Sequence, residues 1–133
     1  NKLIETEIQS FKPNKLFTHS GTDSNNDHRV VFRATIMATR PCNDHIVNQL
    51  FCYEVLSSSE WSFGESFNPN YFVEVQPYDL EKKWEALECY GSEMRKYPFP
   101  RSYEGMRNLA MQRGMQCGRD YAEAFKLIRE FKS

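Results

Sequence analysis

The chain has 133 residues, of which 40% are hydrophobic and 26% charged, and its formal net charge is −1. This length and composition predict one folded domain with a modest core and exclude a disordered chain. The near-neutral charge gives no electrostatic reason to expect nucleic acid or an anionic membrane as a partner, and no apolar run approaches the roughly 20 residues of a transmembrane helix.

The first half of the chain predicts alternating helices and strands. Residues 2–11 have apolar side chains at helical spacing, and residues 15–19 resemble a strand. Val30 to Thr39 reads as a second helix, with Asp27 as its cap or first-turn acid. The almost continuous apolar run 50–56 is typical of a strand buried on both faces. This order predicts an α/β layer architecture.

The second half opens with a long loop, residues 57–70, which is rich in serine, asparagine and aromatic residues. Long loops in compact domains are uncommon unless they bind something or are disordered, and the aromatic side chains argue against disorder. A strand over 71–75 follows, then a helix over about 80–90. Another helix lies around residues 103–113, and the apolar stripe of 120–132 predicts a last helix.

The first residue is Asn1, which lies at the edge of the first predicted helix, with no initiating methionine. We therefore expect the chain to be a piece of a longer protein, and a trimmed tag or a removed leader is the alternative. A chain that lacked part of its sheet would expose apolar strand edges, so self-association as a homo-oligomer is also expected.

Four scattered cysteines include no Cys-x-x-Cys pair, so a structural zinc site built on thiolates is not expected. Scattered thiols suit a reducing compartment better than a secreted disulfide scaffold, which predicts a cytoplasmic protein. The cysteines are Cys42, Cys52, Cys89 and Cys117.

A polar loop between the first predicted strand and the second helix is the place where we expect chemistry. In open α/β sheets, sites form where the carboxyl end of a strand passes into a loop and then a helix. The loop holds His28 beside Asp27. A surface connection without a role would have the same composition.

On residues alone, His28 at a helix start could ligate a metal ion. A catalytic zinc site takes three protein ligands, however. No specific metal-binding pattern is formed by the spacing of His28 from His19, Asp23 or His45. A surface or capping role for His28 therefore stays open. We expect His19, at a strand end, to be a packed histidine, and His45 to lie in a surface turn.

The segment around Trp61 is a candidate sugar-binding site. Carbohydrate sites pair an aromatic face with several polar groups, so Ser59, Glu60 and Trp61 are the candidate substrate-binding residues. Alternatively, Trp61 pins the loop to the core. If the loop binds sugar without catalysis, the chain is a non-catalytic carbohydrate-binding module.

Several segments, in the same order along the chain, resemble the LmbE-like (PIG-L) zinc deacetylases. The resemblance is carried by Phe-Lys-Pro-Asn-Lys-Leu-Phe-Thr-His at 11–19, Asp23-x-x-x-Asp27-His28-Arg29, residues 53–61, residues 67–73 with Glu81-Lys82-Lys83, and Pro100-Arg101-Ser102 with Arg113-Gly114 and residues 122–125. Each piece is short, but together they extend over nearly the whole chain.

This resemblance implies a Rossmann-like three-layer α/β sandwich, here a single partial domain over residues 1–133. It implies a hydrolase that removes the N-acetyl group from an N-acetylglucosamine-type sugar conjugate, so a small amino-sugar conjugate is the expected partner. In the family, zinc or another divalent metal is held by a His and an Asp of an N-terminal His-Pro-Asp-Asp motif and by a His of the segment present here. By position, that last ligand is His28.

Two departures from the family pattern shape the expectations. The His-Pro-Asp-Asp segment is absent from this chain, and with it two ligands and the general base. The fragment alone should therefore be inactive and should bind zinc weakly or not at all. Asn25 stands where some members have a His that assists the leaving group. Asn25 and Asp27 are thus the candidate catalytic residues, with Asp27 expected to act from behind the ligands.

Overall fold

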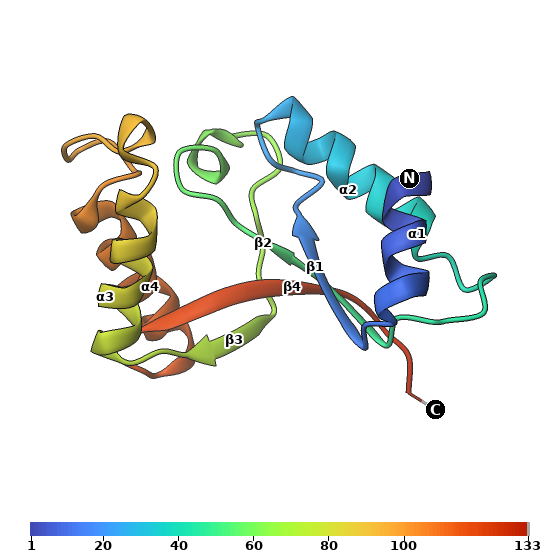
Figure 1. Cartoon of the computed structure of the whole chain (residues 1–133). Coiled ribbons are helices and arrows are strands. Elements are labelled where there is room, and N and C mark those ends of the chain that lie inside the picture. Colours follow the sequence, from blue (N-terminus) through green and yellow to red (C-terminus); the bar gives the residue numbers. More distant parts are fainter. Residues whose placement is uncertain (133) are drawn as a thin grey trace. The chain divides into compact units, whose positions relative to one another are not determined.

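The structure is a computed structural model that describes residues 1–132. Its strands pair in the order β1-β2-β4-β3, and helices accompany them, so the predicted mixed α/β class is confirmed. The chain forms two compact units, one of residues 1–70 with the residues from 125 onward, the other of residues 71–124 (Figure 1). A single domain over the whole chain stays a prediction. No helix in residues 1–132 has the length and apolar character to cross a bilayer.

The first unit alternates helices and strands. It contains α1 (Lys2–Phe11), β1 (Lys15–His19), α2 (Asn26–Ala38), β2 (Gln49–Tyr53), the short 3-10 helix η1 (Ser59–Trp61) and most of β4 (Ala122–Glu130). β1 and β2 are parallel, and β4 runs antiparallel to β2. In the parallel pair His19 stands opposite Tyr53, so both strands end at the same edge of the sheet.

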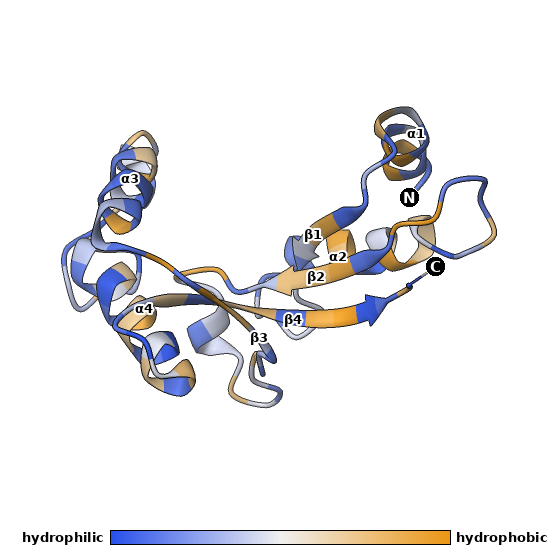
Figure 2. Cartoon of the chain, turned by 90° about the horizontal axis from the view of Figure 1, so that it is seen from below, coloured by the Kyte–Doolittle hydropathy of each residue, from blue (hydrophilic) through white to orange (hydrophobic). Residues whose placement is uncertain are grey.

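Apolar side chains hold this unit together. Leu50, Phe51 and Cys52 of β2 are buried, as the continuous apolar run predicted. A small cluster of Ile8, Ala38 and Val47, with Ile4 and Leu16 packed against it, joins α1, α2 and β1. Figure 2 shows hydrophobic stretches along β2 and β4.

The start of α2 lies four residues before the predicted one. Asn25 is extended, and its side-chain Oδ1 accepts the backbone N–H of Asp27 at 2.9 Å. An asparagine in this position satisfies one of the free N–H groups of the first turn, so the helix begins at Asn26. As a result Asp27 and His28 both belong to the first turn of α2.

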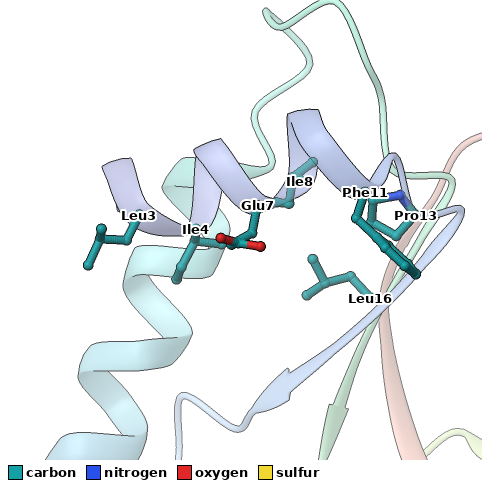
Figure 3. A pocket seen from close by; sticks show the side chains of 7 residues that line it. All are labelled: Leu3, Ile4, Glu7, Ile8, Phe11, Pro13 and Leu16. Carbon is teal, nitrogen blue, oxygen red and sulfur yellow. The ribbon is translucent and has the colours of Figure 1, made fainter.

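One face of α1 stays open. Leu3 and Phe11 are 85% and 81% exposed, and with Ile4, Ile8, Pro13 and Leu16 they line a largely apolar hollow of about 410 Å³ (Figure 3). An exposed apolar patch is a common site of association. The oligomeric state stays a prediction.

The second unit contains β3 (Tyr71–Glu74), α3 (Pro77–Glu88), the 3-10 turn η2 (Gly91–Glu93), α4 (Tyr103–Cys117) and the first residues of β4. The helix predicted over about 80–90 begins at Pro77, so Asp79 lies in the first turn of α3. There its carboxylate accepts the backbone N–H of Gln76 at 2.7 Å in a capping box. Ser102 caps α4 by accepting the N–H of Gly105.

The last element corrects the sequence prediction. Residues 120–132 were expected to form a helix, but residues 122–130 form β4. Gly118, with φ +74°, ends α4 in the left-handed conformation, after which the chain runs along β2. Ala122 and Ala124 are buried at strand spacing. The apolar stripe fits either a helix or a strand, and pairing with β2 selects the strand.

Candidate functional site

Three rings meet where β1 and β2 end. His19 is the last residue of β1, His28 lies in the first turn of α2, and Tyr53 is the last residue of β2. The imidazoles of His19 and His28 stack with centroids 3.8 Å apart and planes 1° apart, and His19 lies 5.0 Å from the Tyr53 ring. The candidate site at the strand ends is therefore built from three elements.

A buried carboxylate lies behind His28. The side chain of Asp23 is 0% exposed and that of His28 is 17% exposed, and Asp23 Oδ2 lies 3.3 Å from His28 Nδ1. This distance suits an ion pair but the contact does not meet hydrogen-bond geometry, and Nδ1 is buried with no other hydrogen-bond partner among the described residues. Asp23 Oδ1 accepts the backbone N–H of Asn25 at 2.9 Å.

Hydrogen bonds tie the polar loop to the segment that carries Trp61. Ser24 Oγ donates to the carbonyl of Ser58 at 2.7 Å, and Ser62 Oγ donates to the carbonyl of Thr22 at 2.7 Å. Ser59 Oγ donates to Asp23 Oδ2 at 3.5 Å while it accepts a backbone N–H at 2.8 Å. The two loops therefore form one surface around Asp23.

Two of the three side chains, His19 and Tyr53, have shifted pKa values that favour the neutral form. Burial lowers the pKa of His19, the nearby His28 lowers it further, and Asp23 acts in the opposite direction. Burial also raises the pKa of Tyr53, with a smaller contribution from Cys52. Nδ1 of His19 is buried without a hydrogen-bond partner in residues 1–132. The lowered pKa of His19 disfavours the imidazolium, and the raised pKa of Tyr53 disfavours the phenolate.

The described residues offer one position of a metal site rather than a complete one. No group of three His, Cys, Asp or Glu side chains within residues 1–132 is arranged to hold a metal ion. His28 is nevertheless arranged as a single ligand would be, because its Nδ1 lies against Asp23 and its Nε2 lies on the opposite side of the ring. His45, considered as a further donor, instead contacts the carbonyl of Pro13 through Nε2 at 2.7 Å.

The two candidate catalytic residues occupy the helix start. The side chain of Asn25 is engaged in capping α2, and Asp27 is exposed in the first turn. The carboxylate that lies against His28 belongs to Asp23, which the sequence analysis considered only as a possible further metal ligand. Catalytic roles for Asn25 and Asp27 stay predictions.

The candidate substrate-binding residues form η1. Ser59 contacts Asp23, as described above, and Glu60 Oε2 accepts the backbone N–H of Ser58 at 3.1 Å. Glu60 is exposed as a residue, yet partial desolvation of its carboxyl raises its pKa against the effect of nearby backbone N–H groups. Trp61 is 50% exposed and meets Phe63 edge to face at 6.4 Å. The indole is thus not pinned inside the core.

Sequence reasoning missed Tyr53, and it considered Asp23 only as a possible further metal ligand, not as a partner of the His28 ring. The register of parallel strands could have identified Tyr53, because residues that end two neighbouring parallel strands meet at one edge. Asp23 carried a weaker signal, since an acid five residues before a histidine has no fixed spatial relation to it. Only the loop conformation brings their side chains together.

No protein-family profile and no curated protein matches the chain. Solved structures do match, among them the following two. The conserved protein TT1542 from Thermus thermophilus aligns at a TM-score of 0.72 with 21% identity, over 99% of this chain and 59% of its own. The N,N'-diacetylchitobiose deacetylase from Pyrococcus horikoshii aligns at 0.68 with 18% identity, over 96% of this chain and 49% of its own. The chain therefore shares the α/β fold of these two proteins, and it spans about half of their length, 59% of the first and 49% of the second.

Proposed function

We propose that this chain is part of a metal-dependent hydrolase that removes the N-acetyl group from an N-acetylglucosamine-type sugar conjugate. Three observations support the proposal: the fold it shares with a diacetylchitobiose deacetylase, the ordered family resemblance, and the position of His28. The last carries most weight, because His28 lies at the carboxyl edge of the parallel strands with a buried carboxylate behind it.

In this proposal His28 is one ligand of a divalent metal, preferably zinc, and acts through Nε2. The metal, when bound, polarises the amide carbonyl and makes a bound water acidic. The other ligands and the general base come from residues outside this chain, as the family resemblance implies. We accordingly expect the 133-residue chain alone to be inactive, because one histidine cannot supply a site.

The remaining residues hold and orient the sugar in this proposal. Trp61 offers a half-exposed flat face, and Ser59 and Glu60 place polar groups beside it. Asn25, in the leaving-group position of the resemblance, can form hydrogen bonds but cannot transfer a proton. The group that protonates the leaving amine is therefore expected elsewhere in the intact enzyme.

The test uses the full-length protein that contains this chain, loaded with zinc. Acetate release is measured with N-acetylglucosamine conjugates, among them N,N'-diacetylchitobiose. We expect release from at least one of them, its loss in His28→Ala, and its retention in His45→Ala, where the changed ring contacts only a backbone carbonyl. A folded, metal-loaded protein that is inert on all of them would contradict the proposal.

A non-catalytic carbohydrate-binding module is the second candidate, and the exposed pair of Trp61 and Phe63 favours it. It predicts glycan binding by this chain alone, measured by calorimetry and weakened by Trp61→Ala. If no glycan binds, this candidate is removed. Under either function we propose a cytoplasmic location, because all four cysteines are free thiols.

A further inference from the structure

We infer that Asp23 is a positioning residue that holds His28 in the tautomer with hydrogen on Nδ1 and so keeps the lone pair of Nε2 free. The role of the free Nε2 lone pair in metal binding rests on the function proposed above, whereas the tautomer itself is a property of this chain. The inference assigns the supporting acid to Asp23 rather than to Asp27, the residue that directly precedes the histidine in the sequence.

The first argument is the surroundings of the ring. His28 Nδ1 is buried, and among the described residues no group meets hydrogen-bond geometry with it. The closest charged oxygen recorded there is Asp23 Oδ2 at 3.3 Å. A neutral imidazole carries a donor on one nitrogen and an acceptor on the other, whereas a carboxylate only accepts. The nitrogen that faces Asp23 must therefore be the donor.

The second argument is that Asp23 is itself held in place. Its side chain is 0% exposed, and its Oδ1 accepts the backbone N–H of Asn25, the residue that caps α2. The hydroxyl of Ser59 donates to the other oxygen. Because the carboxylate is fixed by two separate segments, it can fix the orientation of a third group that approaches it.

The third argument is the stacking of the His28 ring on the His19 ring. His28 stacks on His19 with an interplanar angle of 1°, which opposes rotation of the ring about its Cβ–Cγ bond out of this plane. The stack therefore keeps Nδ1 on the side of Asp23 and Nε2 directed away from it. Hydrogen bonds of this kind are often poorly aligned before a ligand binds.

The test is the tautomer of His28 in this chain, measured by two-bond proton–nitrogen correlation spectroscopy on ¹⁵N-histidine-labelled protein at a pH where imidazole is neutral. We expect hydrogen on Nδ1 in the wild type and a shift toward hydrogen on Nε2 in Asp23→Ala. Asp27→Ala, a matched control that removes an exposed acid in the first turn of α2, should leave the tautomer unchanged. Hydrogen on Nε2 in the wild type would overturn the inference without any variant.

A second readout connects the inference to the metal. In the full-length protein, Asp23→Ala should weaken zinc affinity by about 10- to 100-fold, the usual effect of losing such a partner. Unchanged affinity would overturn the positioning role. If the tautomer is as expected but the full-length protein releases no acetate, the proposed function fails while the assignment of Asp23 stands.

Discussion

The imidazole rings of His19 and His28 lie parallel, with centroids 3.8 Å apart, and join the end of β1 to the first turn of α2. Aromatic pairs of this kind contribute about 0.5–1.5 kcal/mol beyond the area they bury. His19 also carries a buried Nδ1 without a hydrogen-bond partner in the described residues. Stacking and this orphaned atom affect stability in opposite directions.

Replacement of His19 separates the two effects. We expect His19→Ala to lower the free energy of unfolding by about 1–2 kcal/mol, because it removes the stacked ring. His19→Phe keeps a planar ring and removes the unpartnered nitrogen, so it should equal or exceed the wild type. Urea denaturation of the three proteins measures this, and equal losses in both variants would show that the stack contributes nothing.

Asn25 should affect stability whatever its part in catalysis. Its side chain caps α2, so Asn25→Ala should cost about 1 kcal/mol of unfolding free energy, whereas Asn25→Asp should retain most of it. Thermal unfolding of both variants gives the comparison. If Asn25→Ala is as stable as the wild type, the cap is not formed and the side chain is free for another role.

The thiol of Cys52 should be unreactive in the folded chain. It is 1% exposed, and burial raises its pKa from 9.0 to about 11. Cys42 and Cys89 are exposed. Because the thiolate is the reactive form, an alkylating reagent at mildly alkaline pH should modify the two exposed cysteines and reach Cys52 only after unfolding. Mass spectrometry of the peptides decides, and early labelling of Cys52 would contradict its burial.

The same shift predicts a pH dependence of stability. Because the folded pKa of Cys52 lies above the unfolded one, its contribution is complete below about pH 9 and is lost as the pH rises toward 11. A rise from 9.0 to about 11 corresponds to roughly 3 kcal/mol. Comparison with Cys52→Val isolates this contribution from other groups, and parallel stability curves of the two proteins over that range would contradict it.

In the second unit, Gly105 should be irreplaceable. A Cβ at this position would lie 2.0 Å from the carbonyl oxygen of Pro100, so Gly105→Ala forces backbone to move and should cost about 3 kcal/mol or more. Gly91→Ala is the matched control, because a Cβ there meets nothing within 4 Å. Denaturant midpoints compare the two variants. Similar midpoints would show that the backbone around Pro100 is not closely packed.

The sequence predicted most of the elements because their signals were local. β2 was recognisable from an almost continuous apolar run over 50–56, although the strand itself covers Gln49–Tyr53 and ends three residues earlier than predicted. β4 was predicted as a helix because Ala124, Phe125, Leu127 and Ile128 satisfy helical spacing as well as strand spacing. Its conformation follows from pairing with β2, about 75 residues earlier in the chain, which no local window contains.

In the candidate site, too, some residues could be identified from the sequence and others could not. His28 could be identified from its place at a helix start, and the Trp61 segment from its composition. The contacts of Asp23 with His28 and Ser59 depend on two loop conformations, so the sequence could not pair this acid with His28. The stacking of His19 could not be predicted either, because it needs the first turn of α2 to begin at Asn26.

The central claim is that His28 is a metal ligand, and metal content tests it most directly. The full-length protein, purified with zinc present, is compared with its His28→Ala variant by elemental analysis after dialysis, with His45→Ala as control. We predict stoichiometric metal in the wild type and the control and its loss in His28→Ala. Unchanged metal in a folded His28→Ala protein would contradict the claim.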